Sequence, residues 1–239
     1  KLDFAAYDIE IKFEDRLLHT LAEYAFAENT GARGLVSAVE KVLLEYERKL
    51  PSAGIKKFPA TSSILEKPQA SIKALTASDQ EQKTVELFDR LLQQEKESIR
   101  EYLKNNKINL TEKYSLTMTS SRIDLVAKCY VNNTMDIGNV IKKIKSYYDE
   151  IKKIELYFFK NHDINIVLEE DAIDFIIEQL VESFVELKII YEKIDQDFQH
   201  GLKLAREKTG RNRFFITRQA LLDPEGYIGN LIKDKLEPL

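Results

Sequence analysis

A heptad pattern dominates the second half of the chain. Apolar residues recur there at alternating spacings of three and four, first from Ile137 to Phe158 and again from Ile173 to Phe198. A period of about 3.5 residues keeps one seam of a helix facing one partner, so the pattern predicts two long helices that pack as a coiled-coil-like hairpin. The seams form either the core of a helical bundle or a surface for another protein. Their members are Ile137, Val140, Ile144, Tyr147, Ile151, Ile154 and Phe158, then Ile173, Ile177, Leu180, Phe184, Leu187, Tyr191, Ile194 and Phe198.

The composition favours helices over sheets. Only 8 Gly and 5 Pro occur among 239 residues, which is too few for a β-sandwich with many turns. Hydrophobic residues at 44% and charged residues at 32% are typical of a globular chain, long enough for one large core or two small ones. Because short alternating segments add a few strands, we expect an α+β protein that is predominantly α-helical.

Charge and cysteine content exclude several kinds of protein. With 36 Lys and Arg against 40 Asp and Glu, the net charge of -4 gives no general attraction to nucleic acid or anionic lipid. Cys129 is the only cysteine, so an internal disulfide and a cysteine-based zinc site are excluded, and the scattered histidines argue against a histidine-ligated metal. No apolar run approaches the roughly 18 residues of a membrane span. We expect a cytoplasmic protein with no membrane partner.

The chain lacks the motifs of common catalytic sites. It has no phosphate loop of the form G-x-x-x-x-G-K-[ST], and no G-x-G-x-x-G, G-x-S-x-G or H-E-x-x-H motif. Since its first residue is Lys1 rather than methionine, we expect it to be part of a longer protein. We expect no catalysis from these residues alone.

Residues 1–68 are predicted to form a small α/β unit. Ile9–Phe13 alternates apolar and polar residues, as a half-buried strand does, and an amphipathic helix follows it. Asn29-Thr30-Gly31 signals the end of this helix, and Pro51 ends a second one. Ile55–Pro59 is expected to be a strand beside the first, which gives the order strand, helix, helix, strand.

Two further segments complete the expected organisation. Residues 69–155 form a helical extension, in which the capping box Ser78–Glu81 begins a long charged helix. Residues 156–239 contain the second heptad helix, a short strand near Arg213–Thr217 and a final helix near Pro224–Lys235.

A short echo within the chain suggests a repeat. Phe4 and Asp8–Asp15 line up with Phe159 and Asp163–Glu170, 155 residues further on (8 to 163). Glu28–Gly31 similarly resembles Glu207–Gly210. A match this short arises from an internal duplication or by chance. Under duplication, residues 156–239 hold a second strand–helix unit of the same kind as residues 1–68.

One stretch places a cation where cations are unusual. Thr30-Gly31-Ala32-Arg33-Gly34-Leu35 puts Arg33 at the beginning of a helix, where the helix dipole disfavours positive charge. The free N–H groups of a first turn form a weak anion site, and a guanidinium adds a fork of donors that suits a phosphate group. The alternative is an arginine that only faces solvent.

Several stretches within residues 1–68 resemble a known protein family. They are similar to the small C-terminal lid subdomain of Clp/Hsp100-type AAA+ ATPases, most closely the ClpX-like unfoldases. The matching stretches are Phe4, Ile9–Phe13, Ala27–Leu35, Val39-Glu40 and Leu50–Ser52. The resemblance implies a lid-like fold for residues 1–68 and, through the echo, a second lid-like repeat in residues 156–239. The extension beyond residue 68 has no counterpart in ClpX-like chains.

The resemblance also implies a function. The arginine of G-A-R is the sensor-2 residue of that family and reaches the phosphates of bound ATP, so Arg33 would contact ATP while Gly31 and Ala32 shape its turn. The phosphate loop and the magnesium site would belong to a large AAA+ subdomain of the same or a neighbouring subunit. The complete protein would be a homo-oligomer, hexameric by family resemblance, that unfolds or remodels protein substrates. The extension would contact a substrate or an adaptor.

Two alternatives stay open. The chain could instead be a helical protein–protein interaction module with no nucleotide role, in which Thr30–Leu35 is only a turn between helices. The basic stretch Lys203–Arg218, which includes Phe214 and Phe215, fits a solvated helix end, a protein contact or a site for single-stranded nucleic acid. The overall acidity makes nucleic acid the least favoured of these partners.

Overall fold

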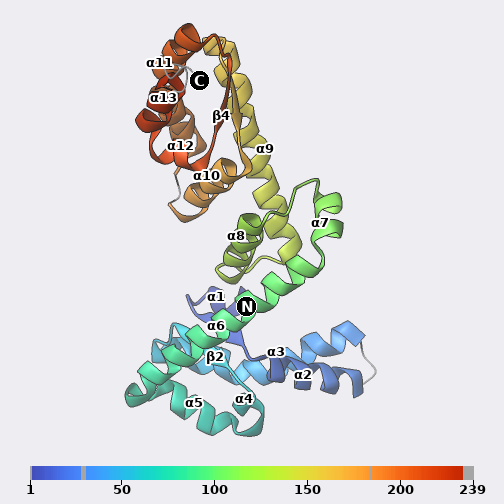
Figure 1. The fold of residues 1–239 in the computed structure, drawn as a ribbon. Helices are drawn as coiled ribbons and strands as arrows, with labels where there is room; N and C mark the ends of the chain where they lie inside the picture. Colours follow the sequence, from blue (N-terminus) through green and yellow to red (C-terminus); the bar gives the residue numbers. More distant parts are fainter. Residues whose placement is uncertain (1, 28–30, 184, 234–239) are drawn as a thin grey trace. The chain divides into compact units, whose positions relative to one another are not determined.

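The computed structural model describes residues 2–27, 31–183 and 185–233 (Figure 1). The described part is predominantly helical and contains two short pairs of parallel strands, in agreement with the expected α+β class. The chain divides into two compact units. The first comprises Lys1–Tyr102 and Val131–Thr134, and the second comprises Leu103–Tyr130 and Met135–Leu239.

The first unit has the predicted order of strand, helix, helix, strand. Its strands pair in parallel, with Ile11 beside Phe58. Further helices follow the second strand. The elements are α1 (Leu2–Ala5), β1 (Glu10–Phe13), α2 (Asp15–Ala27), α3 (Gly31–Lys49), β2 (Lys57–Ala60), α4 (Ser63–Glu66), α5 (Pro68–Thr76) and most of α6 (Glu81–Asn105).

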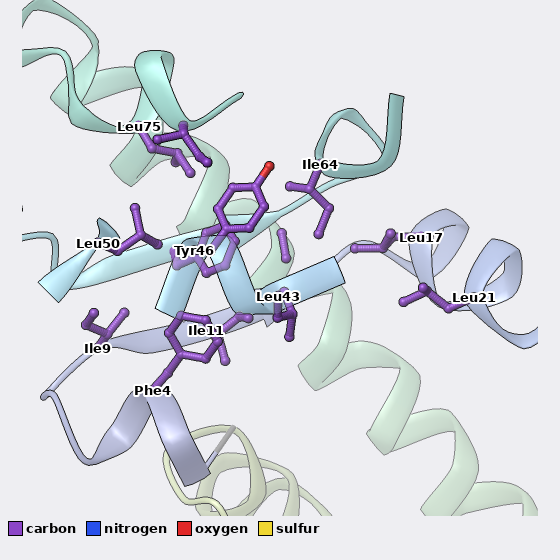
Figure 2. Close-up of a cluster of buried hydrophobic side chains, with 13 residues drawn as sticks. Phe4, Ile9, Ile11, Leu17, Leu21, Leu43, Tyr46, Leu50, Ile64 and Leu75 are labelled. Carbon is purple, nitrogen blue, oxygen red and sulfur yellow. The ribbon is translucent and has the colours of Figure 1, made fainter. Parts of the chain in front are cut away.

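Apolar side chains from the strands and helices of this unit meet in one core (Figure 2). Tyr46 of α3, Leu50 directly after this helix and Phe58 of β2 are fully buried, and the rings of Tyr46 and Phe58 stack with their centroids 5.1 Å apart. The Tyr46 hydroxyl also donates to the carbonyl of Pro68 at 3.2 Å. Burial of a large apolar side chain contributes about 1.5–3 kcal/mol, so these contacts fix the C-terminal half of α3 against the sheet.

The second unit is built around a long helix, α9. Its heptad seam lies in the core, because Val140, Ile144, Ile151, Ile154 and Phe158 are all buried. The elements are the end of α6, α7 (Lys107–Tyr114), α8 (Ser120–Val131), α9 (Ile137–His162), β3 (Asn165–Leu168), α10 (Glu170–Glu182), α11 (Leu187–Thr209), β4 (Arg213–Ile216), α12 (Arg218–Leu222) and α13 (Pro224–Lys233).

The second heptad stretch does not form one helix, so that prediction was wrong. α10 and α11 are separate, and Glu186 between them has an extended backbone with φ −70° and ψ 141°. Phe184 lies outside the described residues. Heptad positions are still buried on both sides of the interruption, as Ile177 in α10 and Ile194 in α11 show. Periodicity predicts which residues face a core, but it does not show whether one helix or two carries them.

The two units share one order of elements. The order helix, strand, helix, helix, strand, short helix, helix holds from α1 to α5 and again from α9 to α13. Both strand pairs are parallel, and α2 and α10 have 13 residues each. Asp8 and Asp163, ahead of the first strand of each repeat, share the left-handed conformation with φ 59° and 56°. That conformation is unusual for residues other than glycine.

The predicted alignment of the repeats was wrong in two places. Gly210 ends α11 with φ 72°, so its counterpart is Gly54, with φ 70°, ahead of β2, and not Gly31 at the start of α3. Both glycines reverse the chain before a strand, which requires the left-handed region that glycine adopts readily. The buried ring ahead of β3 is Phe158, whereas Phe159 is 47% exposed.

Candidate functional site

Arg33 lies in the first turn of α3, and its side chain is exposed. No acidic residue stands in that turn, and Arg33 forms no hydrogen bond or ion pair with any residue that the structure describes. The far end of the helix is fixed in the core through Tyr46 and Leu50. A helix anchored at its far end therefore presents an exposed guanidinium beside its own N-terminal N–H groups, an arrangement that can bind an anion.

Gly31 and Ala32, the other predicted site residues, form the start of α3, and Thr30 lies outside the described residues. Counting from the first strand of each repeat places Lys188 at the position of Arg33, and counting from the second strand places Ile189 there. Asn212, which the sequence match of Thr30-Gly31 with Thr209-Gly210 placed there, lies between α11 and β4 instead. Neither side chain has the donor fork of an arginine, so the described part of the second repeat lacks the arrangement found at Arg33.

Exposed apolar side chains surround the same pair of helices. Tyr24 and Phe26 on α2 are 53% and 82% exposed, and Val36 on α3 is 57% exposed. A groove of about 560 Å³ lies nearby. It is lined by Tyr24, Ala27, Ala38, Lys41, Val42, Glu45, Ile64, Leu65 and Pro68. This surface can accept another polypeptide, because solvated apolar side chains at this density favour contact with a partner.

The second unit contains a charged cluster that the sequence did not predict. Arg122 of α8 is fully buried and donates through Nε and Nη2 to Oδ1 of Asp174 in α10, at 2.8 and 2.6 Å. Its Nη2 also donates to Glu170 Oε2 at 2.8 Å, and its Nη1 donates to the carbonyl of Thr117 at 2.6 Å. The guanidinium lies 5.0 Å from the ring centroid of Tyr148 in α9. One side chain therefore connects α8, α9 and α10.

Hydroxyl groups complete the cluster. Thr119 and Ser121 both donate to Oδ2 of Asp174, the oxygen that Arg122 does not use. The Tyr148 hydroxyl donates to Glu170 Oε1 at 2.9 Å. Because each buried charge has a partner of opposite sign and satisfied hydrogen bonds, the cluster supports packing and leaves no polar group free to bind a ligand.

This environment raises the pKa of Tyr148 to about 12 from its ordinary value of 10.0, first through burial and then through its bond to the carboxylate of Glu170. The unfolded chain therefore loses this proton before the folded chain does, and the second unit should lose stability as the pH rises from about 10 to about 12. We expect Tyr148→Phe to reduce that alkaline loss, measured as the shift of the urea midpoint between pH 9 and pH 11.5. An equal loss in both proteins would contradict this role.

The described residues contain no group of three or more His, Cys, Asp or Glu side chains that could hold a metal ion. Within those ranges, no helix is both long enough and apolar enough to cross a membrane. Cys129 is buried, and burial raises the pKa of its thiol, which makes it a packing residue rather than a reactive one.

Comparison with known proteins returned no match, either among protein-family models or among solved structures.

Proposed function

We propose that the first unit is the lid subdomain of a ClpX-like AAA+ ATPase and that Arg33 is its sensor-2 residue. The proposal rests on the similarity of residues 2–68 to that subdomain and on one structural observation, the exposed Arg33 without a described partner at the start of α3. In the complete protein a large subdomain would supply the phosphate loop and Mg²⁺. ATP would then lie between that subdomain and Arg33.

A sensor of this kind acts through a difference between two states. An arginine that contacts the terminal phosphate of ATP loses that partner after hydrolysis, so the bound nucleotide changes the preferred position of the lid. In a cytoplasmic ring, hexameric by resemblance, this movement would drive unfolding or remodelling of a protein substrate. The second unit would contribute contacts to a substrate or an adaptor.

The site can be tested on the chain alone by titrating the ¹⁵N-labelled protein with inorganic triphosphate and following amide shifts. We expect shifts at Arg33, Gly34 and Leu35 that saturate in the millimolar range, equivalent to about −4 kcal/mol. Arg33→Ala should remove them. Arg48→Ala, which changes an exposed arginine at the other end of α3, should leave them unchanged.

Two results would argue against the proposal. Shifts of equal size at Arg48 would show that triphosphate binds any exposed cation of this helix. An absence of shifts in the first turn at saturating triphosphate would show that the turn does not bind phosphate.

The second candidate is a helical protein–protein interaction module with no nucleotide role. The exposed Tyr24, Phe26 and Val36 favour it, because apolar side chains on a helix pair serve binding to protein more directly than binding to phosphate. The two candidates differ in whether Arg33 affects nucleotide turnover.

A further inference from the structure

The two sheets of the repeat have different surroundings on their outer faces. Successive residues of a strand point to opposite faces, so Ile11 and Phe58 face the core of the first unit while Lys12 and Pro59 face the other way. Lys12 is only 4% exposed and Pro59 is also buried. The outer face of this sheet is therefore covered.

Helix α6 covers it with acidic and apolar side chains. Asp89 of α6 accepts a bond from the Lys57 ammonium at 2.9 Å, and the same ammonium lies 5.2 Å from the ring centroid of Phe88. Glu95, two turns further along, pairs with the Lys12 ammonium at 2.8 Å. An amphipathic helix whose acids meet lysines of the strands thus covers much of this face, and the carbonyl of Val131 also accepts a bond from the Lys12 ammonium.

In the part of the second unit that the structure describes, the equivalent face is more exposed. In the register of β3 and β4, Val167 lies beside Phe215, just as Lys12 lies beside Pro59 in the first unit. Phe215 is 48% exposed and Val167 is half-buried. Arg213, at the position of Lys57, stacks over Phe215 at 5.2 Å and forms no ion pair with a described residue.

The charge around this face is positive. Lys208, Arg211 and Arg213 are all exposed at the end of α11 and the start of β4. A polypeptide that covers Phe215 therefore gains from carrying acids, as α6 does in the first unit. The fold thus repeats the sheet face with a cation in the same place, but none of the described residues pairs with Arg213 as Asp89 pairs with Lys57.

We propose that the outer face of the second sheet, formed by Val167, Arg213 and Phe215, binds an acidic amphipathic helix of a partner protein in the way that the first sheet binds α6. The partner helix carries an acid opposite Arg213 and an aromatic residue one position before it. Because Val167 replaces Lys12, it carries an apolar residue where α6 has Glu95. This contact does not depend on the nucleotide role of Arg33.

A labelled peptide with the sequence of residues 81–105 is a suitable probe, together with a Glu95→Leu version of it. We expect the Glu95→Leu peptide to bind the full chain more tightly in fluorescence anisotropy. Phe215→Ser and Arg213→Glu in the chain should each weaken its binding by about tenfold or more. Lys188→Ala, which changes an exposed cation elsewhere in the second unit, should have no effect.

A charge exchange makes the test independent of folding defects. An Asp89→Lys change in the Glu95→Leu peptide should restore binding to the Arg213→Glu chain. The two changes together exchange the charges of the pair formed by residue 89 of the peptide and residue 213 of the chain. Three outcomes would overturn the proposal: the Glu95→Leu peptide fails to bind, its binding is indifferent to Phe215 and Arg213, or a single-stranded oligonucleotide binds with this dependence while neither peptide does.

Discussion

Arg122→Ala is expected to lower the free energy of unfolding of the second unit by about 3–5 kcal/mol, because it leaves Asp174 charged and buried without a cation. The guanidinium donates to Asp174, Glu170 and the carbonyl of Thr117, so alanine removes partners from several groups at once. The measurement is urea unfolding followed by far-UV circular dichroism, in the transition that belongs to the second unit.

Two controls separate this loss from a general effect of removing a cation. Lys128 lies on the same helix and pairs with Glu182, and the side chain of Lys128 is 41% exposed. Lys128→Ala should therefore cost less than about 1 kcal/mol. The double variant Arg122→Met with Asp174→Leu should recover most of the loss, since apolar residues replace the buried ion pair and the remaining partner, Glu170, is 43% exposed to solvent. A cost for Arg122→Ala that only equals the cost of Lys128→Ala would contradict the burial described.

The local patterns of the first unit predicted its two strands and the helices α2 and α3, but not the short helices α4 and α5. Alternation over Ile9–Phe13 predicted β1, and amphipathic spacing predicted α2 and α3. These signals depend on each residue's immediate neighbours and on one buried face, which periodicity records directly. The same reasoning found the exposed arginine of α3, since a cation in a first turn is visible in the sequence.

The repeat was only partly visible in the sequence. Thr61, Leu65 and Pro68 correspond to Thr217, Leu221 and Pro224, and this second echo was a usable signal. Lys67 and Asp223, which precede the prolines, even share their backbone conformation, with φ −141° and −137°. The match of Thr30-Gly31 with Thr209-Gly210 was misleading. Gly31 begins a helix and Gly210 follows one, and a short sequence match does not distinguish these two positions.

The Arg122 cluster could not be predicted from sequence spacing. Its partners Asp174 and Glu170 lie on α10, about fifty positions further along the chain, and only the packing of α8 against α10 brings the three side chains together. Helix α8 also carries Asp124 and Lys128, so its sequence does not distinguish the buried Arg122 from an exposed cation.

The most direct test of the account is ATP turnover by the complete protein with Arg33 replaced. We expect Arg33→Ala to reduce turnover by more than about tenfold, which corresponds to at least about 1.4 kcal/mol of lost transition-state stabilisation. Arg33→Lys should keep part of the activity, because it retains the charge but not the donor fork. Arg48→Ala on the same helix should match the unmodified protein. Turnover by Arg33→Ala that equals turnover by Arg48→Ala would contradict the sensor role and favour the interaction module.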